Sequence, residues 1–174
     1  MKLFSRSLAL MICGAALTFL SGCSASYDKT FLQPVQPLQG LKNILIITPQ
    51  NGWFGETQYP TSGADVVNAL TKQLKRYASS ISVSEPQEIT AIADEELAKY
   101  DYIFTAKILH WEDRLTGWSF RPDRIEVQFD IYNNQRELMN SILVKGKSAN
   151  VVWVSKQPNS LLPKPIKMIL EELF

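Results

Sequence analysis

Cysteine is almost absent from this 174-residue chain, and both cysteines, Cys13 and Cys23, lie within the first 23 residues. The remainder therefore has no thiol for a disulfide or for binding zinc or an iron–sulfur cluster. Its stability must come from a hydrophobic core, which a hydrophobic content of 45% can supply. The only histidine, His110, gives weak support for a metal site, so we predict neither a metal nor a cofactor.

Motifs that carry out chemistry are also scarce. There is no Gly-x-Ser-x-Gly segment, and Gly52-x-x-Gly55 lacks the further glycine and the following helix of a phosphate-binding loop. His110 and Glu112 share one face of a predicted strand, but Asp113 points to the other face, which argues against a shared metal ion. A Ser–His–Asp arrangement is left open, with His110 as its only available base. We assign no catalytic residue and predict that the protein is not an enzyme.

The longest apolar run covers residues 8–20 and follows two basic residues, Lys2 and Arg6. This run has the length of a secretory signal core and falls short of the about 20 residues needed to span a bilayer. The next residues, Leu20-Ser21-Gly22-Cys23, resemble the lipobox of bacterial lipoproteins. In that motif the cysteine carries the lipid.

The lipobox resemblance implies that residues 1–22 form a signal peptide and that Cys23 becomes the first, lipid-bearing residue. Three acyl chains on one residue would anchor the protein to a membrane permanently, since two lipid signals already suffice. Ser24, where aspartate would imply retention in the inner membrane, implies the outer membrane, and we place the domain on its periplasmic side. The alternatives are an ordinary signal peptide cut near Cys23 and an uncleaved membrane helix.

The remaining chain divides into a tether and one domain. Residues 23–42 contain Pro34, Pro37 and Gly40 without periodicity, which predicts an extended, lipid-anchored tether. Residues 43–174 have the size of a single globular domain. Loss of the two basic residues in the signal peptide changes the formal charge from +1 to −1. A near-neutral domain does not favour nucleic acid, so we expect no nucleic-acid partner.

Hydrophobic patterns predict an α/β fold for this domain, in the order βαβαβ followed by an antiparallel β meander and a C-terminal helix. Five strands in a mixed sheet are expected at 43–48, 81–83, 102–111, 124–132 and 137–147. Helices packed on this sheet are expected at 62–77, 84–98 and 166–173. Ser62 with Asp65 predicts a helix cap, and Asn133-Asn134 predicts a turn with positive φ.

The predicted topology gathers aromatic and arginine side chains at one end of the sheet, where loops 49–61, 112–123 and 148–158 meet. The candidate binding residues are Trp53, Phe54, Tyr59, Trp111, Arg114, Trp118 and Arg121. Aromatic residues with arginine are typical of binding hot spots, so we predict contact with a partner protein or a small ligand. The alternative is that these side chains close the end of the core. Because the tether joins the opposite edge, we expect the lipid at the pole far from the aromatic residues.

Several segments resemble an uncharacterised family of bacterial lipoproteins that is known only as a domain of unknown function. They are Gly52-Trp53-Phe54-Gly55 with Tyr59-Pro60 and Ser62-Gly63, Lys107-Ile108-Leu109-His110-Trp111-Glu112-Asp113-Arg114, Lys145-Gly146-Lys147-Ser148 and Leu161-Leu162-Pro163. The resemblance covers nearly the whole mature chain, although Asn133-Asn134 stands where relatives often carry an acidic residue and Ser-Gly. It implies an address in the cell envelope and no particular reaction.

Three hypotheses on function follow. The first is a non-catalytic binding or accessory lipoprotein of the outer membrane that acts through its aromatic loop edge. The second is an envelope hydrolase that uses His110 with a nearby carboxylate or serine. The third is a structural module that binds through an exposed sheet edge, for which the strand at 137–147 is the candidate.

Overall fold

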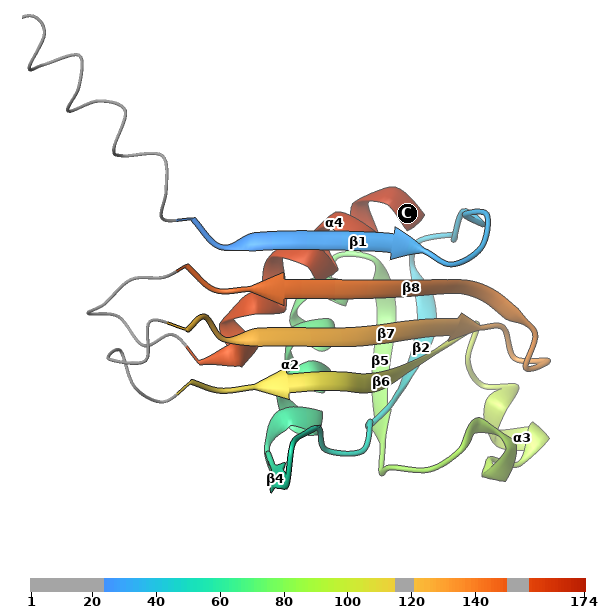
Figure 1. Ribbon diagram of the computed structural model, residues 1–174. Helices are drawn as coiled ribbons and strands as arrows, with labels where there is room; N and C mark the ends of the chain where they lie inside the picture. The colour runs from blue at the N-terminus through green and yellow to red at the C-terminus, as the bar shows by residue number, and fades with distance from the viewer. Residues whose placement is uncertain (1–23, 115–120, 150–156) are drawn as a thin grey trace, which may run out of the picture.

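The computed structural model describes residues 24–114, 121–149 and 157–174 (Figure 1). The candidate residue Trp118 lies outside these ranges. None of the helices within the described ranges is long and apolar enough to cross a membrane.

The described elements alternate between strands and short helices. The strands are β1 (Ser26–Phe31), β2 (Lys42–Ile47), β3 (Trp53–Phe54), β4 (Thr57–Gln58), β5 (Ala78–Ser84), β6 (Tyr102–Glu112), β7 (Arg124–Tyr132) and β8 (Leu138–Lys147). The α-helices are α2 (Ser62–Leu74), α3 (Asp94–Leu97) and α4 (Pro163–Leu173), with 3₁₀ turns η2 (Ile89–Ala91) and η3 (Pro158–Leu161).

The main sheet has the strand order β1-β8-β7-β6-β2-β5, and β3 pairs with β4 in a separate hairpin. β2 is parallel to both of its neighbours, and the remaining pairs are antiparallel. The predicted α/β domain with a mixed sheet is therefore confirmed, but the sheet has six strands rather than five. Residues 44–47 of β2 are all buried, as a continuous apolar run in a central strand requires.

The sixth strand, β1, lies where a tether was predicted. It pairs antiparallel with β8 and packs Tyr27 and Phe31 against the core. The prediction of a tether without regular structure over 23–42 is thus wrong for Ser26–Phe31, because a short strand with polar alternate residues is stabilised mainly by its partner strand. β8 is consequently not a free edge, and the exposed-edge hypothesis fails for that strand; the edges of the described sheet are β1 and β5.

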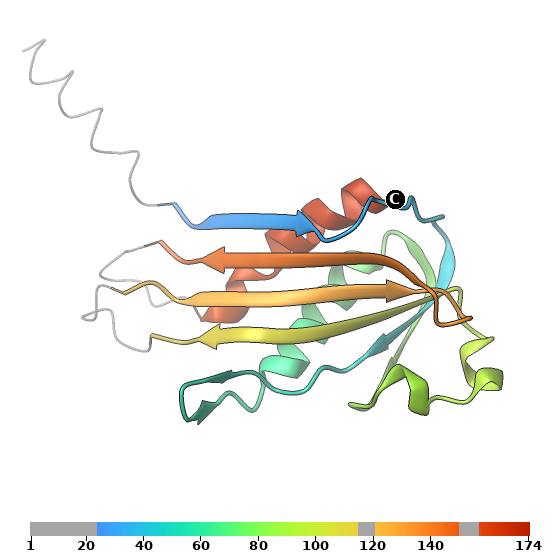
Figure 2. The same ribbon diagram turned by 45° about the vertical axis from the view of Figure 1, so that its right-hand side comes forward.

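The register of β1 decides where the chain enters the domain. Ser26 lies opposite Lys147, Lys147 opposite Arg124, and Arg124 opposite Glu112. We call the end of the sheet marked by these four residues the entry end; in Figures 1 and 2 it lies at the left. The N-terminal segment was predicted to join the domain at the end opposite the loop between β6 and β7. This prediction is wrong, because β1 runs along the sheet from the entry end to the other end before β2 begins.

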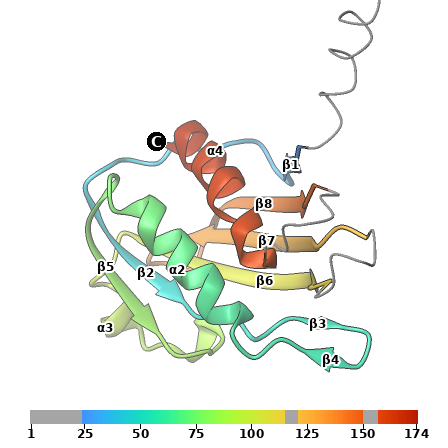
Figure 3. The same ribbon diagram turned by 90° about the vertical axis from the view of Figure 1, so that its left-hand side faces the viewer.

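The two faces of the sheet are covered differently. α2 and α4 pack on one face over the main core, which includes Ile44, Phe104 and Val127 (Figure 3). On the other face, a smaller cluster with Leu45 and Leu97 lies beneath η2 and α3. No described helix covers the rest of that second face, which β1, β8, β7 and the end of β6 form. We call this part the open face.

The helices predicted at 62–77 and 166–173 are present as α2 and α4, but the helix predicted at 84–98 is wrong. Only η2 and α3 form there. Arg136, in the β7–β8 turn, donates a hydrogen bond to the Ile92 carbonyl oxygen (2.5 Å) and pairs with Asp94. These tertiary contacts satisfy backbone groups that a longer helix would satisfy internally.

Two local predictions are also corrected. The N-cap of α2 is Thr61, and the Ser62 hydroxyl instead donates to the Tyr59 carbonyl (2.7 Å) and accepts from the Gly52 N–H (2.8 Å). In the β7–β8 turn the positive φ belongs to Arg136 (φ 63°), since the Asn133 side chain accepts the N–H groups of the following residues.

Candidate functional site

A β-bulge determines which side chains of β6 reach the open face. Ile108 lies opposite Val127 and His110 opposite Glu126, so Leu109 is an extra residue without a partner. The bulge inverts the alternation of the strand: Trp111 packs into the core, and His110 and Glu112 point the other way. A strand without the bulge would place His110 in the core.

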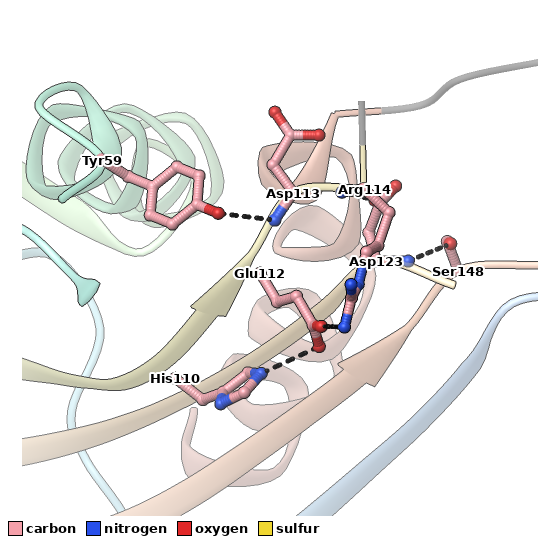
Figure 4. A network of polar contacts seen from close by, with 7 residues as sticks. All are labelled: Tyr59, His110, Glu112, Asp113, Arg114, Asp123 and Ser148. Atoms are coloured by element: carbon pink, nitrogen blue, oxygen red, sulfur yellow. Dashed lines mark hydrogen bonds and ion pairs between the residues drawn. The ribbon is translucent and has the colours of Figure 1, made fainter. Parts of the chain in front are cut away.

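Glu112 is the centre of a polar network at the entry end (Figure 4). Its side chain is only 4% exposed, His110 Nε2 lies 3.2 Å from one carboxylate oxygen, and Arg114 pairs with the other. A buried carboxylate needs such partners because its charge has lost the solvation of water. Both carboxylate oxygens of Glu112 therefore have partners within the protein.

Two aspartates extend the network. The Asp123 carboxylate accepts the Arg114 N–H (2.7 Å), and the Asp123 N–H donates to the Ser148 hydroxyl oxygen (2.9 Å). Burial raises the pKa of Asp123, and the negative charges of Asp113 and Glu112 raise it further against the opposing hydrogen bond from Arg114. Burial also raises the pKa of Asp113, whose Oδ1 has no hydrogen-bond donor among the described residues.

The raised pKa of Asp123 has a consequence for stability. When the pKa of a carboxyl group is higher in the folded state than in the unfolded state, the group adds most to the free energy of unfolding at pH values below its unfolded-state pKa. This contribution is lost as the pH rises through the folded-state pKa. Asp123→Asn keeps an acceptor for the Arg114 N–H without the buried charge. We therefore expect the melting temperature of this variant, relative to the native protein, to increase from pH 4 to pH 7. A constant or decreasing difference over that range would contradict the assignment.

The structure separates the candidate binding residues into different environments. The Phe54 ring lies between His110 (centroids 5.0 Å apart) and the Arg114 guanidinium, which is 5.3 Å from the ring centroid. Tyr59 is half-buried, and its hydroxyl accepts the Asp113 N–H at 3.4 Å. These contacts bring three candidates, Phe54, Tyr59 and Arg114, together at the entry end, and Tyr59 also packs against the main core.

The remaining candidates lie elsewhere. Trp111 is 3% exposed and belongs to the core, so it is not available to a partner. Trp53, on the β3–β4 hairpin, is 54% exposed, and Arg121 is also exposed. The sequence pattern did not indicate the roles of Glu112, considered above only as a metal ligand, or of Asp123, because their burial depends on tertiary packing and leaves no local pattern.

His110 is partly exposed on the open face. The imidazole is 31% exposed, and its described contacts are with Glu112 and the Phe54 ring. No serine, threonine or cysteine side chain is among these contacts. Within the described ranges, no group of three or more acidic, histidine or cysteine side chains is placed to hold a metal ion.

Two hollows lined by described residues open on the surface. The first, of about 400 Å³, lies on the open face at the entry end and is lined by residues that include His110, Ser26, Arg124 and Lys147. The second, of about 560 Å³, lies beside the carboxyl ends of β2 and β5 and has a mixed polar lining that includes Asn51, Glu88 and Lys107.

Solved structures share this fold at low sequence identity. A PelC variant from Paraburkholderia phytofirmans, described as a dodecamer, has 11% identity and a TM-score of 0.62, with 85% of this chain and 98% of that chain covered. A second PelC dodecamer has 12% identity and a TM-score of 0.53, covering 86% and 96% of the two chains. A DUF330 protein from Xanthomonas campestris has 14% identity and a TM-score of 0.50, covering 81% and 88%. Identities this low indicate the fold alone.

No curated protein matches the sequence. A family model described as a domain of unknown function, DUF4823, matches residues 36–173, which includes every described element after β1. This chain therefore belongs to the DUF4823 family.

Proposed function

We propose that this protein is an outer-membrane lipoprotein that acts as a non-catalytic binding or accessory module of the cell envelope. The observation that carries the anchoring is the lipobox-like Leu20-Ser21-Gly22-Cys23, which ends three residues before β1 begins. Anchored through Cys23, the domain sits with its entry end toward the periplasmic surface of the membrane. This orientation replaces the one predicted from the sequence.

The network around Glu112 supports a binding role over catalysis. Its buried carboxylate is paired on both oxygens, and the Phe54 ring contacts both of these partners, His110 and Arg114. A general base for hydrolysis needs a nucleophile or water held at its free nitrogen, and the described contacts of His110 provide no side-chain nucleophile. Among the candidate residues, Trp53 is the best placed to contact a protein partner or small ligand, because it is the most exposed aromatic side chain described.

The anchoring is tested by Cys23→Ser with Cys13→Ser as the matched control. Cys23→Ser removes the sulfur that would carry the lipid, so the protein is expected to move from the membrane fraction to the soluble fraction of the envelope. Cys13→Ser changes a residue within the predicted signal peptide and is expected to leave fractionation unchanged. Retention of the Cys23→Ser protein in the membrane fraction, at the native level, would contradict the proposal.

The binding role is tested in living cells with a photo-crosslinking residue placed at Trp53 or at Leu138. Both side chains are exposed, at 54% and 41%, but Leu138 begins β8 at the end of the sheet far from the entry end. We expect one discrete crosslinked product from position 53 and none from position 138. The protein captured at position 53 can be a different protein or a second copy of this chain. Equal capture at both positions would argue against a specific surface at the hairpin.

A further inference from the structure

Two basic residues face each other at the entry end. Arg124, the first residue of β7, lies directly opposite Lys147, the last residue of β8, and both side chains are exposed. Like charges in a directly opposed pair are destabilising unless an anion lies close by. Both residues line the hollow of about 400 Å³ on the open face, next to Ser26.

The protein itself does not neutralise this pair. No ion pair joins Arg124 or Lys147 to a carboxylate in the described ranges, and Glu112, on the other side of Arg124, is occupied by Arg114 and His110. The sequence outside those ranges, at 1–23, 115–120 and 150–156, contains no aspartate or glutamate. Within the described residues neither cation is therefore paired with a carboxylate, which leaves both available to an anion from outside the chain.

The nearest carboxylates on the open face line the same hollow but lie opposite a different lysine. Asp28 and Glu126 both lie opposite Lys145, one step further from the entry end, and Glu126 pairs with that lysine at 3.0 Å. Of the acidic groups closer to the end, Glu112 and Asp123 are buried and Asp113 is half-buried. Arg124 and Lys147 thus form an exposed pair of positive charges at the entry end of the open face, although the domain as a whole is near neutral.

The position of the chain entry indicates which anion is available. Ser26 lies opposite Lys147, and Cys23 precedes Ser26 by three residues. An extended chain spans about 3.3–3.6 Å per residue, so a lipid on Cys23 is held within roughly 11 Å of the Ser26 Cα. At that distance the anions in highest concentration are the phosphate groups of the membrane surface.

We infer that Arg124 and Lys147 bind the headgroup phosphates of anionic phospholipids and so fix the entry end against the membrane. The inference deepens the proposed function and depends on its lipid anchor for the orientation. The lipid confines the protein to the surface, and the two cations select one orientation of the domain upon it.

The inference is tested with residues 23–174 carrying Cys23→Ser, a chain that keeps every described strand and helix but has no lipid. Its binding to phosphatidylglycerol-containing vesicles and to pure phosphatidylcholine vesicles is measured by sedimentation at low and high salt. We expect binding only to the anionic vesicles, weakening as salt is added. Arg124→Gln/Lys147→Gln is expected to lower the partition coefficient about 30-fold, since each basic residue near an anionic surface contributes about fivefold.

The matched control is Lys75→Gln/Arg76→Gln, which also removes one exposed lysine and one exposed arginine, but at the end of α2 away from the entry end. This control is expected to change vesicle binding less than twofold. Equal losses in the two double variants, or native binding to pure phosphatidylcholine vesicles, would overturn the inference. The melting temperature of Arg124→Gln/Lys147→Gln should not fall, because a like-charge contact is removed.

The vesicle assay tests the phosphate contact, and the fractionation of Cys23→Ser tests the lipid anchor, so each hypothesis can be contradicted without the other. Vesicle binding that is absent, together with release of Cys23→Ser from membranes, overturns the phosphate contact and leaves the lipid anchor standing. Selective vesicle binding, together with retention of Cys23→Ser in membranes, supports the phosphate contact and contradicts the lipid anchor.

Discussion

A chain that begins at residue 33 is expected to lose roughly 3–5 kcal/mol of unfolding free energy, because it lacks a strand that packs two aromatic side chains on the core. β1 pairs with β8 over six residues, and its Tyr27 and Phe31 contact the main core. Its removal also exposes the edge of β8, which favours aggregation. Chemical denaturation of the chain without its lipid measures the loss.

A chain that begins at residue 26 provides the control, because it shortens the N-terminus but keeps β1 intact. Its denaturation midpoint is expected to lie close to that of the chain beginning at residue 24. If the chain beginning at residue 33 were equally stable, β1 would be a tether resting on the sheet, and the orientation derived from its register would no longer hold.

Arg114→Gln is expected to destabilise the domain by roughly 2–3 kcal/mol. Removing one partner of a fully buried ion pair costs about 3–5 kcal/mol, and the effect is smaller here because the Arg114 side chain is 28% exposed. The variant leaves the Glu112 carboxylate buried with His110 as its remaining side-chain partner, and it removes the cation that packs on Phe54. A binding residue on a free surface would show no such loss.

A double-mutant cycle separates the ion pair from general packing. Glu112→Gln is measured alone and together with Arg114→Gln, and the double variant is expected to be more stable than the sum of the two single losses predicts. Simple additivity would mean that the two side chains do not interact, and native stability of Arg114→Gln would return Arg114 to the set of surface residues available to a partner.

Much of the fold follows from local patterns that need no partner element for their recognition. The continuous apolar run of β2 indicated a strand buried on both faces, and the strict alternation of β7 indicated a strand with one buried face. The apolar stripes of α2 and α4 indicated the two helices that cover the sheet. These elements are long and periodic, so their hydrophobic pattern alone identifies them.

The candidate site was predicted less completely. The sequence brought Phe54, Tyr59 and Arg114 to one end of the sheet, and they do lie together there. It could not separate Trp111, a core residue, from the exposed Trp53, because exposure depends on which elements pack over a side chain. The bulge at Leu109, which turns His110 and Glu112 toward the open face, is visible only in the pairing with β7.

The sequence by itself determined the α/β class, the core strands and helices, and the lipobox-like segment that motivates the proposed anchor, because each depends on residues close together in the chain. Only the tertiary structure decided that Ser26–Phe31 is a sixth strand, which end of the sheet the chain enters, and that Glu112 is buried between His110 and Arg114. The physical reason is that β1 gains its hydrogen bonds from β8, more than 100 residues away in sequence, and that a buried charge is stable only where distant partners meet it.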